Sequence, residues 1–168
     1  MAAAESTTLY VGQDHCAAIY RNLLVMVVHE DPRPDLVQHQ QRWMKELAER
    51  VSGPKGFMVV LRPDNPPPAE EARGTIRRAF QQFGEGMSFG AMVVEKTGFK
   101  AAAQRGALTM IILAARPAYP LKVFATVAEA TRWIVDNFGA EARLSLTDVM
   151  IAVERLKASY DGGTLRVG

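Results

Sequence analysis

Metal-capable side chains gather in one segment, where His29, Glu30, Asp31, Asp35 and His39 form the only such cluster in the sequence. If a helix begins near Asp35, then Asp35 and His39 share one helical face at a spacing of i, i+4, which would supply half of a metal site. No second ligand pair with zinc or iron spacing accompanies them. Acidic residues also favour helix N-termini without any metal. We therefore predict that no bound metal connects His29 with His39.

The single cysteine, Cys16, is the second candidate for chemistry because it follows His15 directly. A histidine can deprotonate a neighbouring thiol and make it nucleophilic. Adjacent residues of a strand point to opposite faces, however, so a dyad of His15 and Cys16 has poor geometry. We interpret Cys16 as a small buried apolar group. One cysteine allows neither an intrachain disulfide nor a cysteine-based zinc site, and it fits a reducing, cytoplasmic compartment.

The sequence contains no G-x-S-x-G, no G-x-x-x-x-G-K-[ST] and no G-x-G-x-x-G. These motifs build a nucleophile elbow, a phosphate-binding P-loop and a dinucleotide-binding turn, respectively. Hydrolase, P-loop and dinucleotide-binding functions therefore lose their main support. We predict that the protein is not an enzyme and that it holds no cofactor.

Arginines mark one predicted helix, which carries Arg73, Arg77 and Arg78 on its outer face. Arg73 and Arg77 are candidates for contact with an anion or an acidic partner. Pairing with Glu70 and Glu71 at helical spacing would instead make this an ordinary solvated face, which is the interpretation we favour.

Composition narrows the class of protein further. The 168 residues are 48% hydrophobic, enough for one sizeable core, and the formal net charge of +2 is too small for a nucleic-acid footprint. Glu5 stands where a secretory signal would carry basic residues, so we expect no such signal. Gln104 and Arg105 interrupt the longest apolar stretch, which is shorter than the roughly 20 residues of a membrane span.

Apolar runs of strand length alternate with helical periodicity along the chain. We predict strands over residues 9–11 and 16–20, which could be one bent strand, and over 23–28, 57–61, 89–94 and 121–125. We predict helices over residues 36–51, 68–83, 99–114, 127–138 and 146–160. This pattern indicates an α/β fold with a mostly parallel (mixed) sheet of four to five strands, helices packed on it and an extra C-terminal helix. We expect a single domain, with an N-terminal strand segment (1–21), an α/β core (22–138) and a C-terminal helix and tail (139–168).

The helix over residues 99–114 is almost wholly apolar, so it needs cover on most sides. Core packing, a second subunit or partner, and a lipid-like ligand are all open as explanations. We expect the C-terminal helix to share in this cover, within the chain or on a second copy. The candidate interaction surface comprises Phe99, Met110, Ile111, Val149, Val153 and Leu156.

Four motifs carry a resemblance to a known family: VVEKTGFKAA (93–102), RGALT (105–109), YPLKVF (119–124) and ATRWI (130–134). With them, residues 22–136 resemble the bacterial STAS-like, SpoIIAA-like proteins, which share their plan with anti-sigma-factor antagonists and CRAL-TRIO lipid-binding domains. The resemblance implies a STAS-like fold. It implies less about function, because one fold hosts many activities.

The chain departs from this family at the phosphorylation site. In the antagonists a serine that accepts phosphate follows the strand equivalent to residues 57–61, whereas RPDNPPPA (62–69) contains no hydroxyl. We therefore expect no phosphate on residues 64–68 and no kinase-controlled switch there. Thr75 is the nearest acceptor, and it lies inside the predicted helix.

Two functions follow as hypotheses. The first is a non-catalytic STAS-like interaction domain in bacterial regulation, which binds itself or another protein. The second is a small carrier of apolar, lipid-like ligands, for which the candidate contacts are Met87, Phe89, Met92, Phe99 and Met110.

Overall fold

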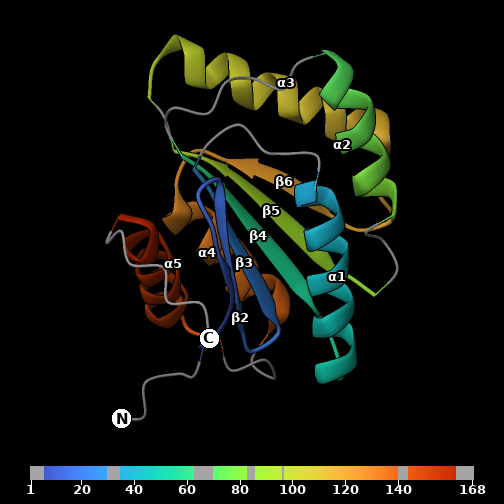
Figure 1. Cartoon of the computed structure of the whole chain (residues 1–168). Coiled ribbons are helices and arrows are strands. Elements are labelled where there is room, and N and C mark those ends of the chain that lie inside the picture. The colour runs from blue at the N-terminus through green and yellow to red at the C-terminus, as the bar shows by residue number, and fades with distance from the viewer. Residues whose placement is uncertain are drawn as a thin grey trace.

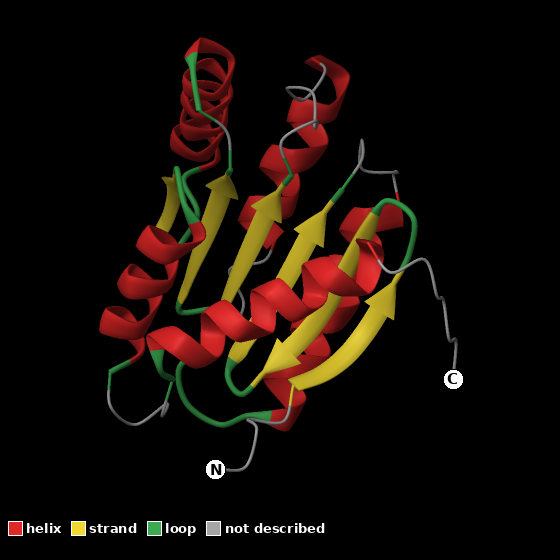
Figure 2. Cartoon of the chain, turned by 90° about the vertical axis from the view of Figure 1, so that its left-hand side faces the viewer, coloured by secondary structure: helices red, strands yellow, loops and turns green. Residues whose placement is uncertain are grey.

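A computed structural model of the chain describes residues 6–29, 35–62, 70–82, 86–95, 97–139 and 144–161. Within these residues, six strands form one sheet in the order β1-β2-β3-β4-β5-β6. The strands are β1 (Ser6–Val11), β2 (His15–Tyr20), β3 (Leu23–Val28), β4 (Gly56–Leu61), β5 (Phe89–Val94) and β6 (Leu121–Phe124). The helices are α1 (Asp35–Arg50), α2 (Glu70–Gln82), α3 (Phe99–Ala115), α4 (Val127–Phe138) and α5 (Leu146–Asp161) (Figures 1 and 2).

Strands β3 to β6 run parallel to one another, with a helix between each strand and the next. Strands β3 and β5 are buried along their whole length, because helices cover both faces of the sheet and their sequences are continuously apolar. The predicted α/β architecture with a mostly parallel, mixed sheet is confirmed.

The predicted number of four to five strands is too low, because residues 6–20 form two full strands. Strand β1 pairs antiparallel with β2, and β2 pairs antiparallel with β3. The first turn is closed by a hydrogen bond from Gly12 N to His15 O of 2.9 Å. The second turn has only two residues, Arg21 and Asn22, and Arg21 adopts a positive φ of 51°. Two-residue turns of this kind usually contain glycine, but Arg21 and Asn22 form this one.

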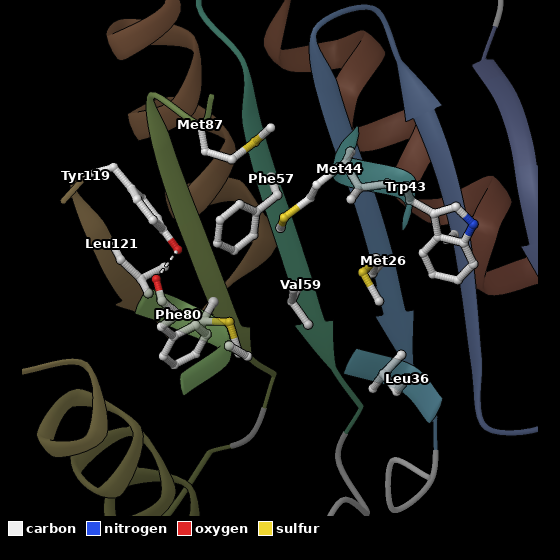
Figure 3. Close-up of a cluster of buried hydrophobic side chains, with 14 of the residues drawn as sticks. Met26, Leu36, Trp43, Met44, Phe57, Val59, Phe80, Met87, Tyr119 and Leu121 are labelled. Carbon is white, nitrogen blue, oxygen red and sulfur yellow. Dashed lines mark hydrogen bonds between the residues drawn. The ribbon is translucent and has the colours of Figure 1, made fainter. Parts of the chain in front are cut away.

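The helices form two layers. Helices α1, α2 and α3 lie on one face of the sheet, and α4 and α5 lie on the other (Figure 1). Because consecutive parallel strands are neighbours in the sheet, crossovers of one hand bring their connecting helices to the same face. Each face has its own core. The first core includes Trp43, Met44, Phe57 and Phe80 (Figure 3), together with Ile111 and Ile112. The second core includes Tyr20, Met58, Phe89, Ile134, Val149 and Val153.

Helix α5 docks within the chain, on the face of the sheet opposite α3, so it gives α3 no cover. Val149, Val153 and Leu156 pack into the second core. The second half of α3 instead buries Ile111, Ile112 and Ala115 in the first core, beside α2 and β6. None of the described helices is both long enough and apolar enough to cross a membrane.

Candidate functional site

The metal-capable residues of the sequence are divided by the sheet. His29 follows β3 on the α5 side, where its ring stacks on Tyr160 with centroids 3.6 Å apart and planes 11° apart. His39 lies on the α1 side, with its ring centroid 5.7 Å from that of His15. His29 and His39 are therefore not members of one site.

The other three members of that cluster are described only in part or not at all. Asp35 is the first residue of α1, and its side chain is not among those described; Glu30 and Asp31 lie outside the described residues. Across the part of the chain that the structure describes, no three His, Cys, Asp or Glu side chains are placed to hold a metal ion.

His15 belongs to a buried cluster between the β1–β2 hairpin and α1. Its ring stacks on Tyr10 at a centroid distance of 4.6 Å and lies 5.6 Å from the ring of Trp43. Its Nδ1 lies 3.0 Å from a carboxylate oxygen of Asp14. Asp14 and His15 are both buried. A histidine that a carboxylate orients can act as a base. This histidine is buried among the rings of Tyr10, His39 and Trp43, which join the hairpin to α1.

Cys16 lies on the opposite face of the sheet from His15, as the alternation of a strand requires. The structure supplies a different imidazole. Sγ of Cys16 lies 3.5 Å from Nε2 of His29, and Cys16 is wholly buried in the second core. A thiol beside an imidazole can become a reactive thiolate, yet reaction also needs access. Here the ring of Tyr160 is stacked on His29.

The Cys16–His29 pair depends on the register of the β2–β3 hairpin. Cys16 pairs with Val27, and the backbone N–H of His29 bonds to the carbonyl oxygen of Asp14 at 2.7 Å. His29 is thus the diagonal neighbour of Cys16 on the same face. Sequence reasoning missed it because the two-residue turn that sets this register was not recognised.

The arginines of α2 form a solvated face. Nη1 of Arg73 lies 3.4 Å from a carboxylate oxygen of Glu70, three residues earlier, and both side chains are exposed. Arg78 donates to the hydroxyl of Thr75 at 3.4 Å, and Arg77 is exposed. This arrangement fits the interpretation of an ordinary charged helix surface. Contact of Arg73 and Arg77 with an anion or an acidic partner stays a prediction.

Helix α3 leaves an apolar surface in water. The exposed fractions of Phe99, Met110 and Leu113 are 89%, 66% and 63%. With 3.6 residues per turn, these side chains project within about 40° of one direction, opposite the buried side of the helix. We call the α3 face the set of exposed residues around that direction: Phe99, Ala102, Ala103, Gly106, Met110, Leu113 and Ala114. None of these residues carries a polar side chain, and the exposed Thr109 and Lys100 lie at the two margins of the face.

The predicted interaction surface is therefore divided. Phe99 and Met110 belong to the α3 face, whereas Ile111, Val149, Val153 and Leu156 are buried in the two cores and cannot contact a partner in the folded protein. Leu113 was missed because an apolar helix carries no polar side to show which residues face outward.

The outer side of α5 carries a shallow depression of about 510 Å³, lined by Thr147, Met150, Ile151, Glu154, Arg155 and Ala158. None of these residues belongs to the His15 or Cys16 clusters. The proposed ligand contacts do not gather around it either. Met87 and Met92 pack in the first core, and Phe89 packs in the second.

No protein-family model, no curated protein and no solved structure matches this chain. Of the surfaces and clusters described above, the α3 face departs most from what a solvated helix normally presents.

Proposed function

We propose that the protein is a non-catalytic interaction domain of STAS-like type, which acts by binding a protein through the α3 face. The observation that carries this proposal is the outward side of α3, which is apolar between the exposed Lys100 and Thr109 at its margins. A helix that is apolar all round normally has its entire surface covered. Here one side is covered by the first core, and the other side has no cover within the described chain.

The size of the exposed surface supports a binding role. If each of these side chains is given the roughly 200 Å² of a large aromatic residue as an upper value, the exposed fractions of Phe99, Met110 and Leu113 leave up to about 440 Å² of apolar surface in water. A contiguous apolar patch of a few hundred Å² on a monomer often marks a binding site.

The placement of the polar clusters supports binding rather than catalysis. Cys16 and His15 are buried, and aromatic rings enclose or stack on both of their clusters. The motif over residues 93–102, which carries the resemblance to STAS-like proteins, runs from the end of β5 into the first turn of α3. Residues 64–68, where we expect no phosphate, lie outside the described residues. A cytoplasmic location is part of the same proposal and rests on the single cysteine.

Photo-crosslinking in cells tests the proposal. A photoreactive residue at position 110 should yield a covalent protein adduct, whereas the same residue at position 151, exposed on the opposite side of the sheet, should not. The adduct at position 110 should disappear when Phe99→Ser and Leu113→Ser are added, since these remove its neighbours on the α3 face.

Equal crosslinking at positions 110 and 151, or no protein adduct at either, would contradict the proposal. So would native mass spectrometry that shows a lipid-like molecule bound to the wild-type protein and lost from Met110→Ser. That result would instead favour a carrier of apolar ligands.

A further inference from the structure

We infer that the occupant of the α3 face is the α3 face of a second copy, with the two helices antiparallel and crossing at Gly106. This inference rests on the proposed function and names the partner of the same surface. Four features of α3 lead to it: the spacing of its exposed residues, their order of size, the glycine at their centre, and the area and charge of the face.

The spacing is that of a helix-pairing seam. Phe99, Ala103, Gly106, Met110 and Leu113 follow one another at intervals of four, three, four and three residues. This is the a/d alternation by which two helices interlock their side chains along a common seam. The residues between these positions either turn toward the first core or flank the seam.

The order of sizes suits self-pairing in the antiparallel sense. Phe99 and Leu113 each lie seven residues from Gly106, on opposite sides of it. An antiparallel partner would place Leu113 opposite Phe99 at both ends of the seam. Met110 would meet the small Ala103 of the other copy, so a large side chain enters the space beside a small one. A two-fold axis through Gly106 makes both halves of this contact identical, as an isologous dimer requires.

The glycine at the centre is not required by the fold of one chain. Glycine is a poor residue for a helix interior, and a Cβ at position 106 would meet no atom within 4 Å. A glycine at a helix crossing allows a second backbone to approach closely. Gly74 in α2 also has open space around it. The side chains one turn away, Glu70, Arg77 and Arg78, are exposed and charged, so Gly74 serves as a matched control.

The area is sufficient for a specific dimer. With its four small residues, the α3 face offers up to roughly 600 Å² per copy, so a symmetric pair that covered the whole face would bury at most roughly 1,200 Å² in total, close to the roughly 1,000 Å² that a specific interface needs. Such an area lies at the low end of stable interfaces, so we expect a dimer that dissociates on dilution.

Charge does not oppose the pairing. The face itself has no charged residue, and Arg105 beside it donates to the backbone carbonyl of Val94 at 3.4 Å. Lys100 lies six residues from the crossing, so the two copies of its ammonium group would be about 18 Å apart along the axis, beyond the Debye length in physiological salt. Insertion into a lipid surface is less favoured, because Ala102, Ala103 and Gly106 at the centre of the face would bury little apolar area.

Cysteine crosslinking tests the antiparallel arrangement of the two helices. The wild-type protein serves as the negative control, because its single cysteine, Cys16, is buried. Under mild oxidation, Gly106→Cys should form a disulfide-linked dimer, and the wild type and Gly74→Cys should not. Phe99→Cys and Leu113→Cys should each fail to link alone, because equivalent residues are about 21 Å apart across the axis, far beyond disulfide reach. An equimolar mixture of these two variants should link.

Analytical ultracentrifugation tests the strength of the self-association. The wild type should sediment as a dimer that dissociates on dilution. The double variant Met110→Ser, Leu113→Ser should associate at least about 100-fold more weakly, since each lost side chain counts twice in a symmetric pair. The control Ile151→Ser should associate like the wild type. Circular dichroism should show that all three proteins are folded.

Three results would overturn the inference. A wild type that stays monomeric at its highest soluble concentration excludes the dimer. If Phe99→Cys alone and Leu113→Cys alone each formed a disulfide-linked homodimer, the two helices would be parallel. If the wild type, but not the double variant, bound anionic phospholipid vesicles without dimerising, the occupant of the α3 face would be a lipid surface. An in-cell adduct from position 110 to a different protein would overturn only the self-pairing, whereas the absence of any protein adduct would overturn the proposed function as well.

Discussion

Replacing Leu156 by alanine should destabilise the protein strongly, whereas the same replacement of Ile151 on the same helix should not. Leu156 is 3% exposed and packs in the second core, while Ile151 is 44% exposed on the outer side of α5. Both variants shorten one aliphatic side chain of four carbons on an interior turn of α5. The comparison therefore isolates which side of α5 is docked on the sheet.

The expected difference follows from burial. Truncation of a buried leucine to alanine removes apolar contacts and leaves a cavity, which lowers the free energy of unfolding by about 2 to 5 kcal/mol. Alanine is a better helix former than leucine or isoleucine by a few tenths of a kcal/mol, so propensity offsets little of this loss at position 156. At position 151 the lost burial is partial and the gain in propensity is similar in size, so the change should stay within about 1 kcal/mol.

Urea unfolding followed by circular dichroism measures both values, at one protein concentration so that any self-association affects each variant equally. The free energy of unfolding of a typical domain is about 5 to 15 kcal/mol, so the unfolding midpoint of Leu156→Ala should shift clearly to a lower urea concentration. If Leu156→Ala fails to fold, Leu156→Val provides a milder loss at the same site. Equal midpoints for Leu156→Ala and Ile151→Ala would refute the docking of α5 through its buried stripe, and with it the separation of α5 from α3.

Two further predictions concern buried side chains. Tyr160→Ala should increase the rate at which a thiol reagent labels Cys16 in the folded protein by about tenfold or more, because the Tyr160 ring is stacked on His29 beside that thiol; an unchanged rate would mean that Tyr160 does not control access. Tyr119→Phe should lower the free energy of unfolding by about 1 kcal/mol, because it removes the hydrogen bond of 3.3 Å from the hydroxyl to the carbonyl of Phe80 (Figure 3). Burial raises the pKa of Tyr119 well above its usual value. The unfolded chain therefore releases this proton first, and the stability due to this group is complete below about pH 10 and falls as the pH rises further. The loss of unfolding free energy between about pH 9 and pH 11 should be smaller in Tyr119→Phe than in the wild type, and equal losses would contradict the assignment.

The sequence alone determined most of the secondary structure and the class of the fold. Strand β5 was predicted with its observed bounds, because its apolar run stands between glycine-rich and charged segments that end it on both sides. Helix α4 was predicted just as closely, since its apolar residues recur at helical spacing and Thr126 caps its first turn with a hydrogen bond from the N–H of Glu129. Both signals depend only on residues close together in the chain, so the sequence alone is enough to predict these elements.

Tertiary structure decided which residues meet. Cys16 and His29 are 13 positions apart, and only the register of the β2–β3 hairpin brings them within 3.5 Å of each other. His29 and His39 are closer in sequence, yet the sheet lies between their rings. Distance along the chain does not predict contact where strands pair and helices cross from one face to the other.

Tertiary structure also decided which side of each apolar helix is exposed. In α5 a clear apolar stripe marked the docked side, although the sequence did not say which face of the sheet it would cover. In α3 nearly every residue is apolar, so the sequence does not indicate which side of the helix faces outward. It therefore could not show whether Met110 or Ile111 is exposed. Packing against α2 and β6 buries Ile111 and leaves Met110 in water. The apolar α3 face exists because the sheet and α2 cover only one side of the helix.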